Sequence, residues 1–419
     1  MTDRISRQPM KLKGRAAGIA TAGFALLLAC GVHAQSGGLA LPEDGAPING
    51  TAQAGSAAVA RDAQTAWLNP AGMTRLESRE VMLSLQPLNL GFTFQPAADN
   101  EQPGTDGGNQ GGWVPGGALF YAAPVNDKLA WGLSVTSPSG LVLDPDDDWT
   151  GRYFMTKTAF VALNIEPSVG VALGEDWAIG GGIDIQYASL KQEIAVNRPL
   201  DQPDGRVTID GDSWRVGASL SLLWEPSENS RLGLRYRSPM AHELSGDMTA
   251  LGDRPVSTDL TIPQNLTLSW FQPISPVVSL LFDIGWQNWA SFDKTIITVD
   301  GENDRQFEIP RDFKDTWTVS GGVHWRTSPS WLLMAGAGYT SAAVADDKRT
   351  PDMPVDEQIR AALGVEYEFD PRWRVGFNYT YLWLGNNAVD DQATPLTGRV
   401  VGNYDAKAHI IGIYGSLRI

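Results

Sequence analysis

Cysteine is nearly absent from this chain, which has one, Cys30, in 419 residues. One cysteine excludes an intramolecular disulfide. The four histidines show no metal-ligand spacing, and there is no nucleophile motif, so we expect no metal, no cofactor and no catalytic residues. After residue 34, no apolar run approaches the ~18 residues that a membrane helix needs. Basic residues number 32 against 48 acidic ones, which argues against nucleic acid as a partner.

Residues 1–34 have the pattern of a secretory signal peptide that is removed. A basic end precedes an apolar run at 16–29 and a small-x-small site at 32–34, and the run is too short for a membrane anchor. Lipidation of Cys30 stays open as an alternative, although Leu28 fits a lipoprotein box poorly. Removal of five basic residues and one acidic residue changes the net charge from −16 to −20. An exported chain without an apolar helix is periplasmic, secreted or a membrane β-barrel.

From Glu80 onwards, apolar residues alternate with small or polar ones at a period of two. The segments 177–187 and 373–383 are clear examples, with tryptophan, isoleucine, tyrosine or phenylalanine at every second position or nearly so. This alternation predicts strands with one apolar face. A soluble β-sandwich would give the same alternation, so the pattern alone does not decide between the two architectures.

The connections between these strands favour a membrane barrel. Short turns and long polar segments alternate, which gives fourteen strands with six turns at one end and seven loops at the other. Outer-membrane barrels have even strand numbers and sort their connections in this way, with short periplasmic turns and long extracellular loops. The predicted turns lie at 126–128, 174–176, 226–230, 274–276, 328–330 and 370–372, and the predicted loops near 96–115, 139–156, 197–212, 246–257, 300–313, 342–356 and 386–403.

Tryptophan and tyrosine positions support the same architecture. Aromatic residues lie near the short turns and again about ten residues along the same strand face, as in Trp177 and Tyr187 or Trp214 and Trp224. Ten residues at ~3.3 Å each, tilted by about 40°, rise ~25 Å, the height of the lipid-facing band between two aromatic girdles. We therefore expect a lipid-facing aromatic girdle at each end of the strands.

The segment Ala54–Leu76 differs from the strands that follow it. It is rich in small residues, it predicts one helix or two short ones over 55–68, and it stops at Asn69-Pro70. We interpret it as a plug inside the barrel. The predicted organisation is a signal peptide at 1–34, an N-terminal, partly helical hatch at 35–78, and a 14-stranded antiparallel transmembrane β-barrel at 79–419.

Several stretches resemble the FadL/TodX family of outer-membrane transporters. The first is Asn69-Pro70-Ala71, and the resemblance covers roughly residues 37–419 in the family's order. The resemblance implies a fourteen-stranded barrel with a hatch, which imports hydrophobic molecules and releases them sideways through a wall gap near the third strand. The longer matching stretches lie at 137–158 (beginning S-P-S-G-L-V-L-D-P-D-D-D-W), 283–294 (D-I-G-W-Q-N-W-A-S-F-D-K), 312–325 (D-F-K-D-T-W-T-V-S-G-G-V-H-W) and 349–358 (R-T-P-D-M-P-V-D-E-Q).

Two local features are candidates for the transport path. We expect Asn69, Pro70 and Ala71 to hold the hatch near the third-strand gap and act as its gate, although the tripeptide could also be an ordinary turn. The gap itself is predicted at Ser137, Pro138 and Gly140, because proline donates no backbone hydrogen bond and glycine weakens a strand. The alternative is that Pro138 only ends the strand.

Charged residues on the non-aromatic strand faces are expected in the lumen. Both signs occur there, so a structural ion network is one interpretation, and contact of an arginine with a substrate carboxylate is the other. The substrate-binding candidates are Arg235, Arg237 and Arg360, with Lys191 as a weaker one because its parity is outward.

The predicted function is passive uptake of long-chain fatty acids or similar hydrophobic molecules, such as aromatic hydrocarbons, across a Gram-negative outer membrane. An open polar porin and, less favoured, an outer-membrane lipid hydrolase are the alternatives. The expected partners are the hydrophobic small molecule, outer-membrane lipid and the barrel-assembly machinery, and we expect a monomer.

Overall fold

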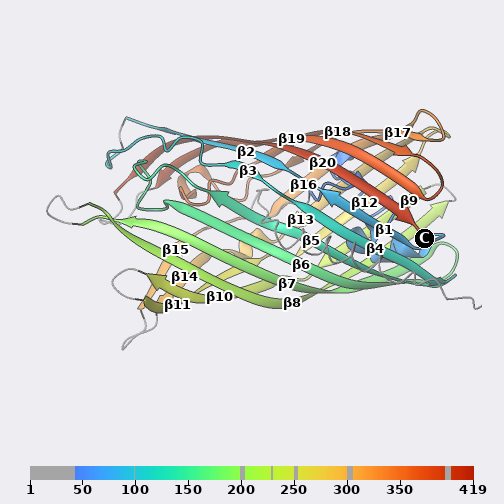
Figure 1. Cartoon of the computed structure of the whole chain (residues 1–419), viewed down its shortest axis with the longest axis horizontal. Coiled ribbons are helices and arrows are strands. Elements are labelled where there is room, and N and C mark those ends of the chain that lie inside the picture. Colours follow the sequence, from blue (N-terminus) through green and yellow to red (C-terminus); the bar gives the residue numbers. More distant parts are fainter. Residues whose placement is uncertain are drawn as a thin grey trace, which may run out of the picture.

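The computed structural model describes residues 43–98, 100–198, 203–227, 230–249, 253–299, 305–391 and 398–419. The predicted signal peptide, Cys30 and the first part of the predicted hatch lie outside these residues. Most of the described chain is strand, wound into one elongated barrel (Figure 1).

Twenty strand segments form one closed antiparallel sheet. Six consecutive pairs of segments, such as β1 with β2, each continue one barrel strand, so the barrel has fourteen strands, as predicted. It closes where β1 and β2 pair with β20. The segments are β1 Glu80–Leu85, β2 Leu88–Pro96, β3 Gly112–Val114, β4 Gly117–Asn126, β5 Leu129–Leu143, β6 Lys157–Ala172, β7 Trp177–Val196, β8 Gly205–Ser227, β9 Ser230–Arg237, β10 Met240–Thr249, β11 Asp253–Ile262, β12 Asn265–Pro273, β13 Val278–Gln287, β14 Lys294–Val299, β15 Arg305–Pro310, β16 Thr316–Arg326, β17 Trp331–Thr340, β18 Gln358–Glu368, β19 Trp373–Asp391 and β20 Val400–Arg418.

The two ends of the barrel differ in their connections. All six predicted short turns are present, and we call that end the turn end and the opposite one the loop end. Three predicted long segments are loops, at 97–111, 144–156 and 341–357, whereas at the other four the strands continue further than predicted. At three of these four, in the hairpins of β8, β10, β11, β14 and β15, apolar side chains such as Ile209, Val256 and Ile297 pack into a separate cluster. This packing extends the strands beyond the aromatic girdle.

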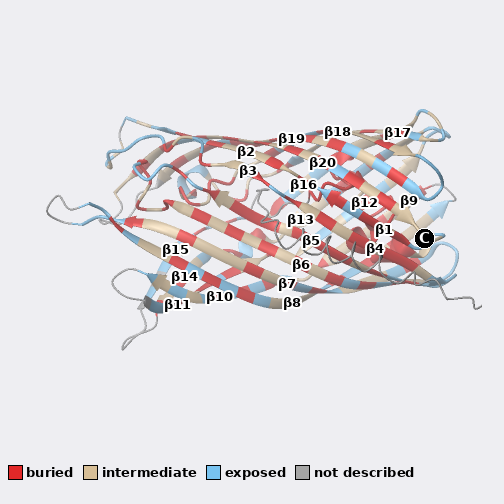
Figure 2. Cartoon of the chain, in the orientation of Figure 1, coloured by how far each residue is buried: buried red, intermediate tan, exposed pale blue. Residues whose placement is uncertain are grey.

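The outer face of the barrel carries the predicted aromatic girdles. Trp131, Trp177 and Trp373 are exposed near the turn end, and Trp214 and Trp317 are exposed ten residues or so further along their strands or neighbouring strands. Buried and exposed residues alternate along many of the strands, as Figure 2 shows for the side in view. None of the helices among the described residues is long and apolar enough to cross a membrane.

The hatch lies inside the barrel, at the turn end. Within 43–78 there are three short helical segments, the 3₁₀ helices η1 Pro47–Thr51 and η2 Pro70–Arg75 and the four-residue α-helix α2 Thr65–Leu68. The predicted helix over 55–68 is therefore wrong for most of its length. Gly55 and Ala60 have positive φ angles of 84° and 42°, which a continuous right-handed helix cannot contain. Contacts with the barrel wall, rather than helical hydrogen bonds, fix this part of the chain.

Candidate functional site

Asn69 holds the hatch together and ties it to the barrel wall. Its side-chain amide donates to the carbonyl oxygens of Ala57 in the hatch, at 2.6 Å, and of Leu222 on β8, at 3.1 Å. Its Oδ1 accepts the backbone N–H of Ala71 at 3.1 Å, and that N–H also lies 3.1 Å from the Ser221 hydroxyl. One buried side chain thus joins the two halves of the hatch to one strand.

The remainder of the tripeptide packs on glycines of the next two strands. A Cβ atom added at Gly170 on β6 or at Gly180 on β7 would collide with the backbone of Pro70 or Ala71. Close approach of the two chains therefore requires glycine there. The tripeptide is bonded to β8 and packed on β6 and β7, further round the wall from the third barrel strand, β5, than we expected.

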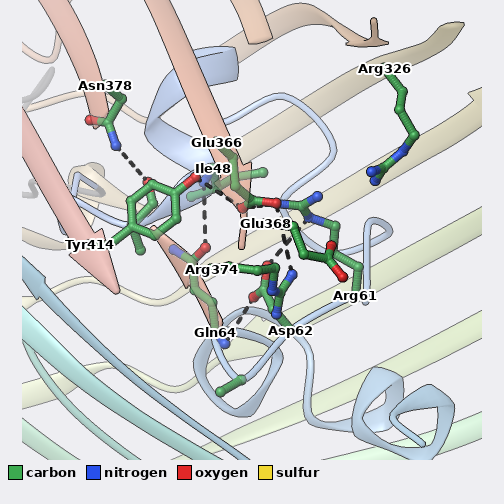
Figure 3. Close-up of polar contacts among 12 residues, drawn as sticks. Ile48, Arg61, Asp62, Gln64, Arg326, Glu366, Glu368, Arg374, Asn378 and Tyr414 are labelled. Atoms are coloured by element: carbon green, nitrogen blue, oxygen red, sulfur yellow. Dashed lines mark hydrogen bonds and ion pairs between the residues drawn. The ribbon is translucent and has the colours of Figure 1, made fainter. Parts of the chain in front are cut away.

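A buried ion network fixes the hatch on the opposite side of the lumen (Figure 3). Arg61 of the hatch lies 2.5 Å from a carboxylate oxygen of Glu366 on β18, which also accepts the Tyr414 hydroxyl at 3.0 Å. Arg374 lies 2.5 Å from Glu80 and 4.0 Å from Glu366. Because Glu80, Glu366 and Arg374 are almost fully buried and Arg61 is only 18% exposed, loss of one partner would leave an uncompensated charge in the lumen.

A third anchor uses a carboxylate that forms no ion pair with any described residue. Asp283 on β13 accepts the backbone N–H of Gly55 at 2.6 Å and of Ser56 at 3.2 Å, together with the Ser56 hydroxyl at 2.5 Å. Ser269 on β12 accepts the N–H of Ala57 at 2.8 Å. The hatch is therefore bonded to strands on several sides of the barrel.

A cavity of about 150 Å³ lies directly on the loop-end side of the hatch. Trp67 and Leu68 of the hatch form part of its floor, and wall strands supply the rest of its lining. It reaches the third barrel strand, where it touches 137–139. Its other wall residues include Arg235, Arg237, Met240, Asp283, Trp286 and Arg360.

Two of the three candidate arginines in this cavity are already paired. Arg237 lies 2.5 Å from both Glu166 and Asp184, and its guanidinium stacks 3.3 Å from the centre of the Trp67 ring. Arg360 donates to Glu43 of the hatch at 2.8 Å and to the Thr340 hydroxyl at 2.9 Å. Both therefore belong to the structural ion network that the sequence offered as one interpretation.

Arg235 is different because it has no acidic partner among the described residues. Its one hydrogen bond goes from Nη1 to the Trp67 carbonyl oxygen at 3.2 Å, and its Nε has no partner among those residues. The fourth candidate, Lys191, lies outside the cavity lining and pairs with Glu193 at 3.3 Å. Among the described residues of the cavity lining, Arg235 is thus the arginine without a carboxylate partner.

The third barrel strand, β5, is irregular around Pro138. β5 does not end at Pro138 but continues to Leu143, and its register with β6 shifts between Thr136 and Ser139. Towards β4, its last paired residue is Val135, and over 136–143 no described residue pairs with this edge. We call this feature the β4–β5 break. The Ser137 hydroxyl donates to Ala162 O at 2.6 Å, inside the shifted segment.

The sequence pointed to the arginines but missed the part that the hatch plays in the cavity. Trp67 contributes its ring to Arg237 and its carbonyl oxygen to both Arg235 and Arg237. Its position two residues before Asn69 was the available signal. Strand parity placed Arg237 in the lumen, but it could not show which carboxylates lie opposite it.

Comparison with known proteins identifies the relationship. Residues 27–418 match the family model described as outer membrane protein transport protein (OMPP1/FadL/TodX). The chain belongs to the FadL family. It is 23% identical over 394 residues to a long-chain fatty acid transport protein of Escherichia coli O6:H1, covering 84% of this chain and 87% of the relative. It is 24% identical over 449 residues to outer membrane protein P1 of Haemophilus influenzae, covering 93% and 96%.

Solved structures of FadL-type proteins share the fold. A Pseudomonas aeruginosa FadL homologue superimposes with a TM-score of 0.83 at 21% identity, covering 91% of this chain and 99% of that one. The Pseudomonas putida toluene transporter TodX gives 0.68 at 14% identity, with 93% and 99% covered. Membership of the FadL family makes the chain an outer-membrane transport protein rather than an enzyme, so the hydrolase alternative is set aside.

Proposed function

We propose that this protein takes up long-chain fatty acids, or hydrophobic carboxylates like them, by passive transport. The observation that carries the choice of cargo is Arg235, an arginine without a carboxylate partner among the described residues, in a cavity that also contains Trp67, Leu68 and Met240. The relatives in E. coli and in P. putida are named for fatty acid and for toluene transport, so family membership alone leaves both cargo classes open.

A carboxylate is the chemistry that such a site recognises. A partly buried cation without a counter-ion is unfavourable, and a carboxylate removes that cost while forming charge-assisted hydrogen bonds with the guanidinium. A neutral aromatic hydrocarbon would leave the cost in place. The cavity volume of about 150 Å³ is below the ~300 Å³ of an ordinary ligand pocket. We therefore infer that the cavity holds the carboxylate and the first part of the alkyl chain of the fatty acid.

The remainder of the path follows from the apolar character of the cargo. The loops are taken to be extracellular, so the cargo enters at the loop end and passes the apolar side chains there. From the cavity, an aqueous route through the hatch would cost about 0.8 kcal/mol for each exposed CH₂. The β4–β5 break, bordered by Ser137, Pro138 and Gly140, offers a sideways exit into lipid instead. In this proposal Asn69, Pro70 and Ala71 set the position of the hatch that opens or closes the route.

The remaining partners are proposals of the same kind. Outer-membrane lipid surrounds the aromatic girdles and receives the cargo, and the barrel-assembly machinery inserts the chain. We propose a monomer that needs no energy-coupling partner, because a concentration gradient suffices for a passive route.

Uptake by a deletion strain that carries Arg235→Met tests the choice of cargo. We expect slow uptake of a labelled C16 or C18 fatty acid but unchanged uptake of toluene vapour, because only the acid needs the guanidinium. Arg235→Lys should recover part of the fatty acid uptake. Arg326→Met, which alters an arginine outside the cavity lining, is the matched control. Equal fatty acid uptake by Arg235→Met and the control would contradict the proposal.

A further inference from the structure

The strand β8 is held very differently along its two edges. Towards β7, twenty successive residue pairs run without interruption from Trp177↔Trp224 to Val196↔Gly205. Towards β9 and β10, pairing stops after Ser219↔Arg237 and resumes at Asp212↔Ser245, with a shift of one residue. Between these points, 213–218 and 238–244 form no ladder pairs with each other, although 213–218 pair with β7 and 240–244 pair with β11. We call this second interruption the β8–β10 break.

Side chains supply the hydrogen bonds that the ladder lacks there. Ser238 donates its N–H to Ala218 O at 2.9 Å and accepts the Ala218 N–H on its hydroxyl at 2.9 Å. Arg215 donates from Nε to Ala241 O at 2.7 Å and from Nη1 to Trp214 O at 3.0 Å. Unpaired backbone groups are costly in lipid, so these side chains keep the wall closed.

On its inner side, the break borders the cavity that contains Arg235. Arg237, Ser238 and Met240 all line that cavity and lie at or beside the break. Opposite them is Gly217, whose missing side chain leaves space: a Cβ there would lie 2.9 Å from the Ser238 hydroxyl oxygen and 3.1 Å from Met240 Cγ. At this point of the wall, only small or flexible side chains separate the cavity from the outer surface of the barrel.

On its outer side, the break meets the lipid-facing surface. Val216 is 71% exposed and Trp214 is 57% exposed, the latter in the loop-end girdle. Arg215 has the parity of the buried Ser213 and Ser219, yet its Nη2 lies 3.6 Å from Glu243, whose side chain is 62% exposed. The Arg215 side chain thus passes through the break from the inner to the outer face and fills it.

We propose that the β8–β10 break is a second lateral port between the cavity and the membrane, closed by the Arg215 side chain. Its occupant is the cargo of the proposed function, a long apolar chain with a carboxylate, so this inference rests on that function. Rotation of the Arg215 side chain breaks its two hydrogen bonds to carbonyl oxygens and its solvent-exposed ion pair with Glu243. Breaking these contacts costs less than separating a continuous ladder such as β7–β8. The barrel would open here without losing any strand pairing.

A cysteine pair across the break tests the port. Gly217→Cys with Met240→Cys is the test pair, because a Cβ at 217 would lie 3.1 Å from Met240 Cγ, the position that a cysteine sulfur at 240 would take, and the single natural cysteine lies at position 30. The control pair, Ala188→Cys with Ser213→Cys, joins directly paired residues of the continuous β7–β8 ladder. Uptake of a labelled C16 fatty acid is measured in cells with oxidised and with reduced protein. Heat-modifiable gel migration shows that each variant is folded.

With two parallel exits of equal barrier, the oxidised Gly217/Met240 pair should take up the fatty acid at about half the reduced rate, and the control pair should be unaffected. A photoreactive residue at Val216 should also crosslink the labelled cargo in reduced protein more than one at Val319, another exposed lipid-facing residue. Equal uptake in both redox states with no excess crosslink at Val216 would overturn the second port. Absence of fatty acid uptake in the unmodified protein would instead overturn the proposed function.

Discussion

The two halves of the lumen are filled in opposite ways. At the turn end, the hatch is held by buried ion pairs and by side chains that bond its backbone, as Glu366 and Asn69 do. At the loop end, a large cluster of buried apolar side chains fills the space, including Phe94, Leu141 and Phe160. Directional polar bonds fix one position, whereas apolar packing admits an apolar guest at little cost. This difference supports our proposal that the turn end is closed and that the cargo enters at the loop end.

The largest effect should come from labelling, which tests which half faces outwards. Cysteines at Asp106 or Asp390 should react with an impermeant maleimide on intact cells, and one at Asp127 should not. All three positions lie in or beside connections, at the loop end for the first two and at the turn end for the third. Gly107 is a poor choice because its φ is +76° and a Cβ would meet Trp149. If only Asp127→Cys were labelled, the turn end would face outwards and the proposed orientation would be wrong.

The next largest effect should follow Glu366→Ala. This change leaves Arg61 and Arg374 buried with fewer counter-charges, and loss of one partner of a buried ion pair costs about 3–5 kcal/mol. The temperature at which the barrel band shifts on a gel should fall markedly. Glu308→Gln breaks the exposed pair with Lys294 and should cost about 0–1 kcal/mol. Equal shifts for the two variants would show that the hatch network does not hold the turn end.

Asn69→Ala should have a smaller effect on stability and a clear effect on uptake. It removes two hydrogen bonds to carbonyl oxygens, one of them to the barrel, and such a loss costs about 1–3 kcal/mol when the remaining partners are buried. The protein should be exported and heat-modifiable, because the barrel ladder is intact, while fatty acid uptake falls at equal abundance. Normal uptake would reduce the tripeptide to an ordinary turn.

The smallest effect should be a pH dependence in the loop 341–357. Burial raises the pKa of Asp352. The guanidinium of Arg311, 2.8 Å away, and the hydrogen bonds that Asp352 accepts lower this pKa by more than burial raises it, so the net pKa is below the ordinary value. A lowered folded pKa stabilises the loop fully above the unfolded pKa of about 3.9 and less as the pH falls through the folded value. Limited proteolysis of this loop should therefore increase at acidic pH, and Asp352→Asn should be cut readily at every pH. A wild-type loop with a pH-independent cutting rate would contradict this assignment.

Much of the barrel was predictable because period-two alternation and tryptophan spacing follow directly from a lipid-facing strand. Trp177 and Trp224, for example, meet across neighbouring strands with ring centres 5.1 Å apart. The hatch was less predictable, because small residues such as Ala60 fit a helix by propensity while wall contacts impose other backbone angles. The predicted loops were too long where apolar side chains such as Ile209 and Val256 pack between extended hairpins.

The candidate site was predictable as a set of residues but not in its pairing. Strand parity identified Arg235, Arg237 and Arg360 as lumen residues. Which of them is paired depends on Glu166 and Asp184, on neighbouring strands, and on Glu43 of the hatch, all brought together only by register and folding. Lys191 is not part of the cavity lining, because its outward parity places it beside Glu193.

The measurement that tests the central claim most directly is the affinity of purified protein for a fatty acid and for the fatty alcohol of equal chain length. The two ligands differ only in the carboxylate. We expect wild type to bind the acid more tightly by about tenfold to a hundredfold, since a charge-assisted hydrogen bond contributes about 1.5–3 kcal/mol. Arg235→Met should bind acid and alcohol equally. If wild type already binds them equally, or if Arg235→Met keeps the preference, Arg235 does not receive the cargo and the account is wrong.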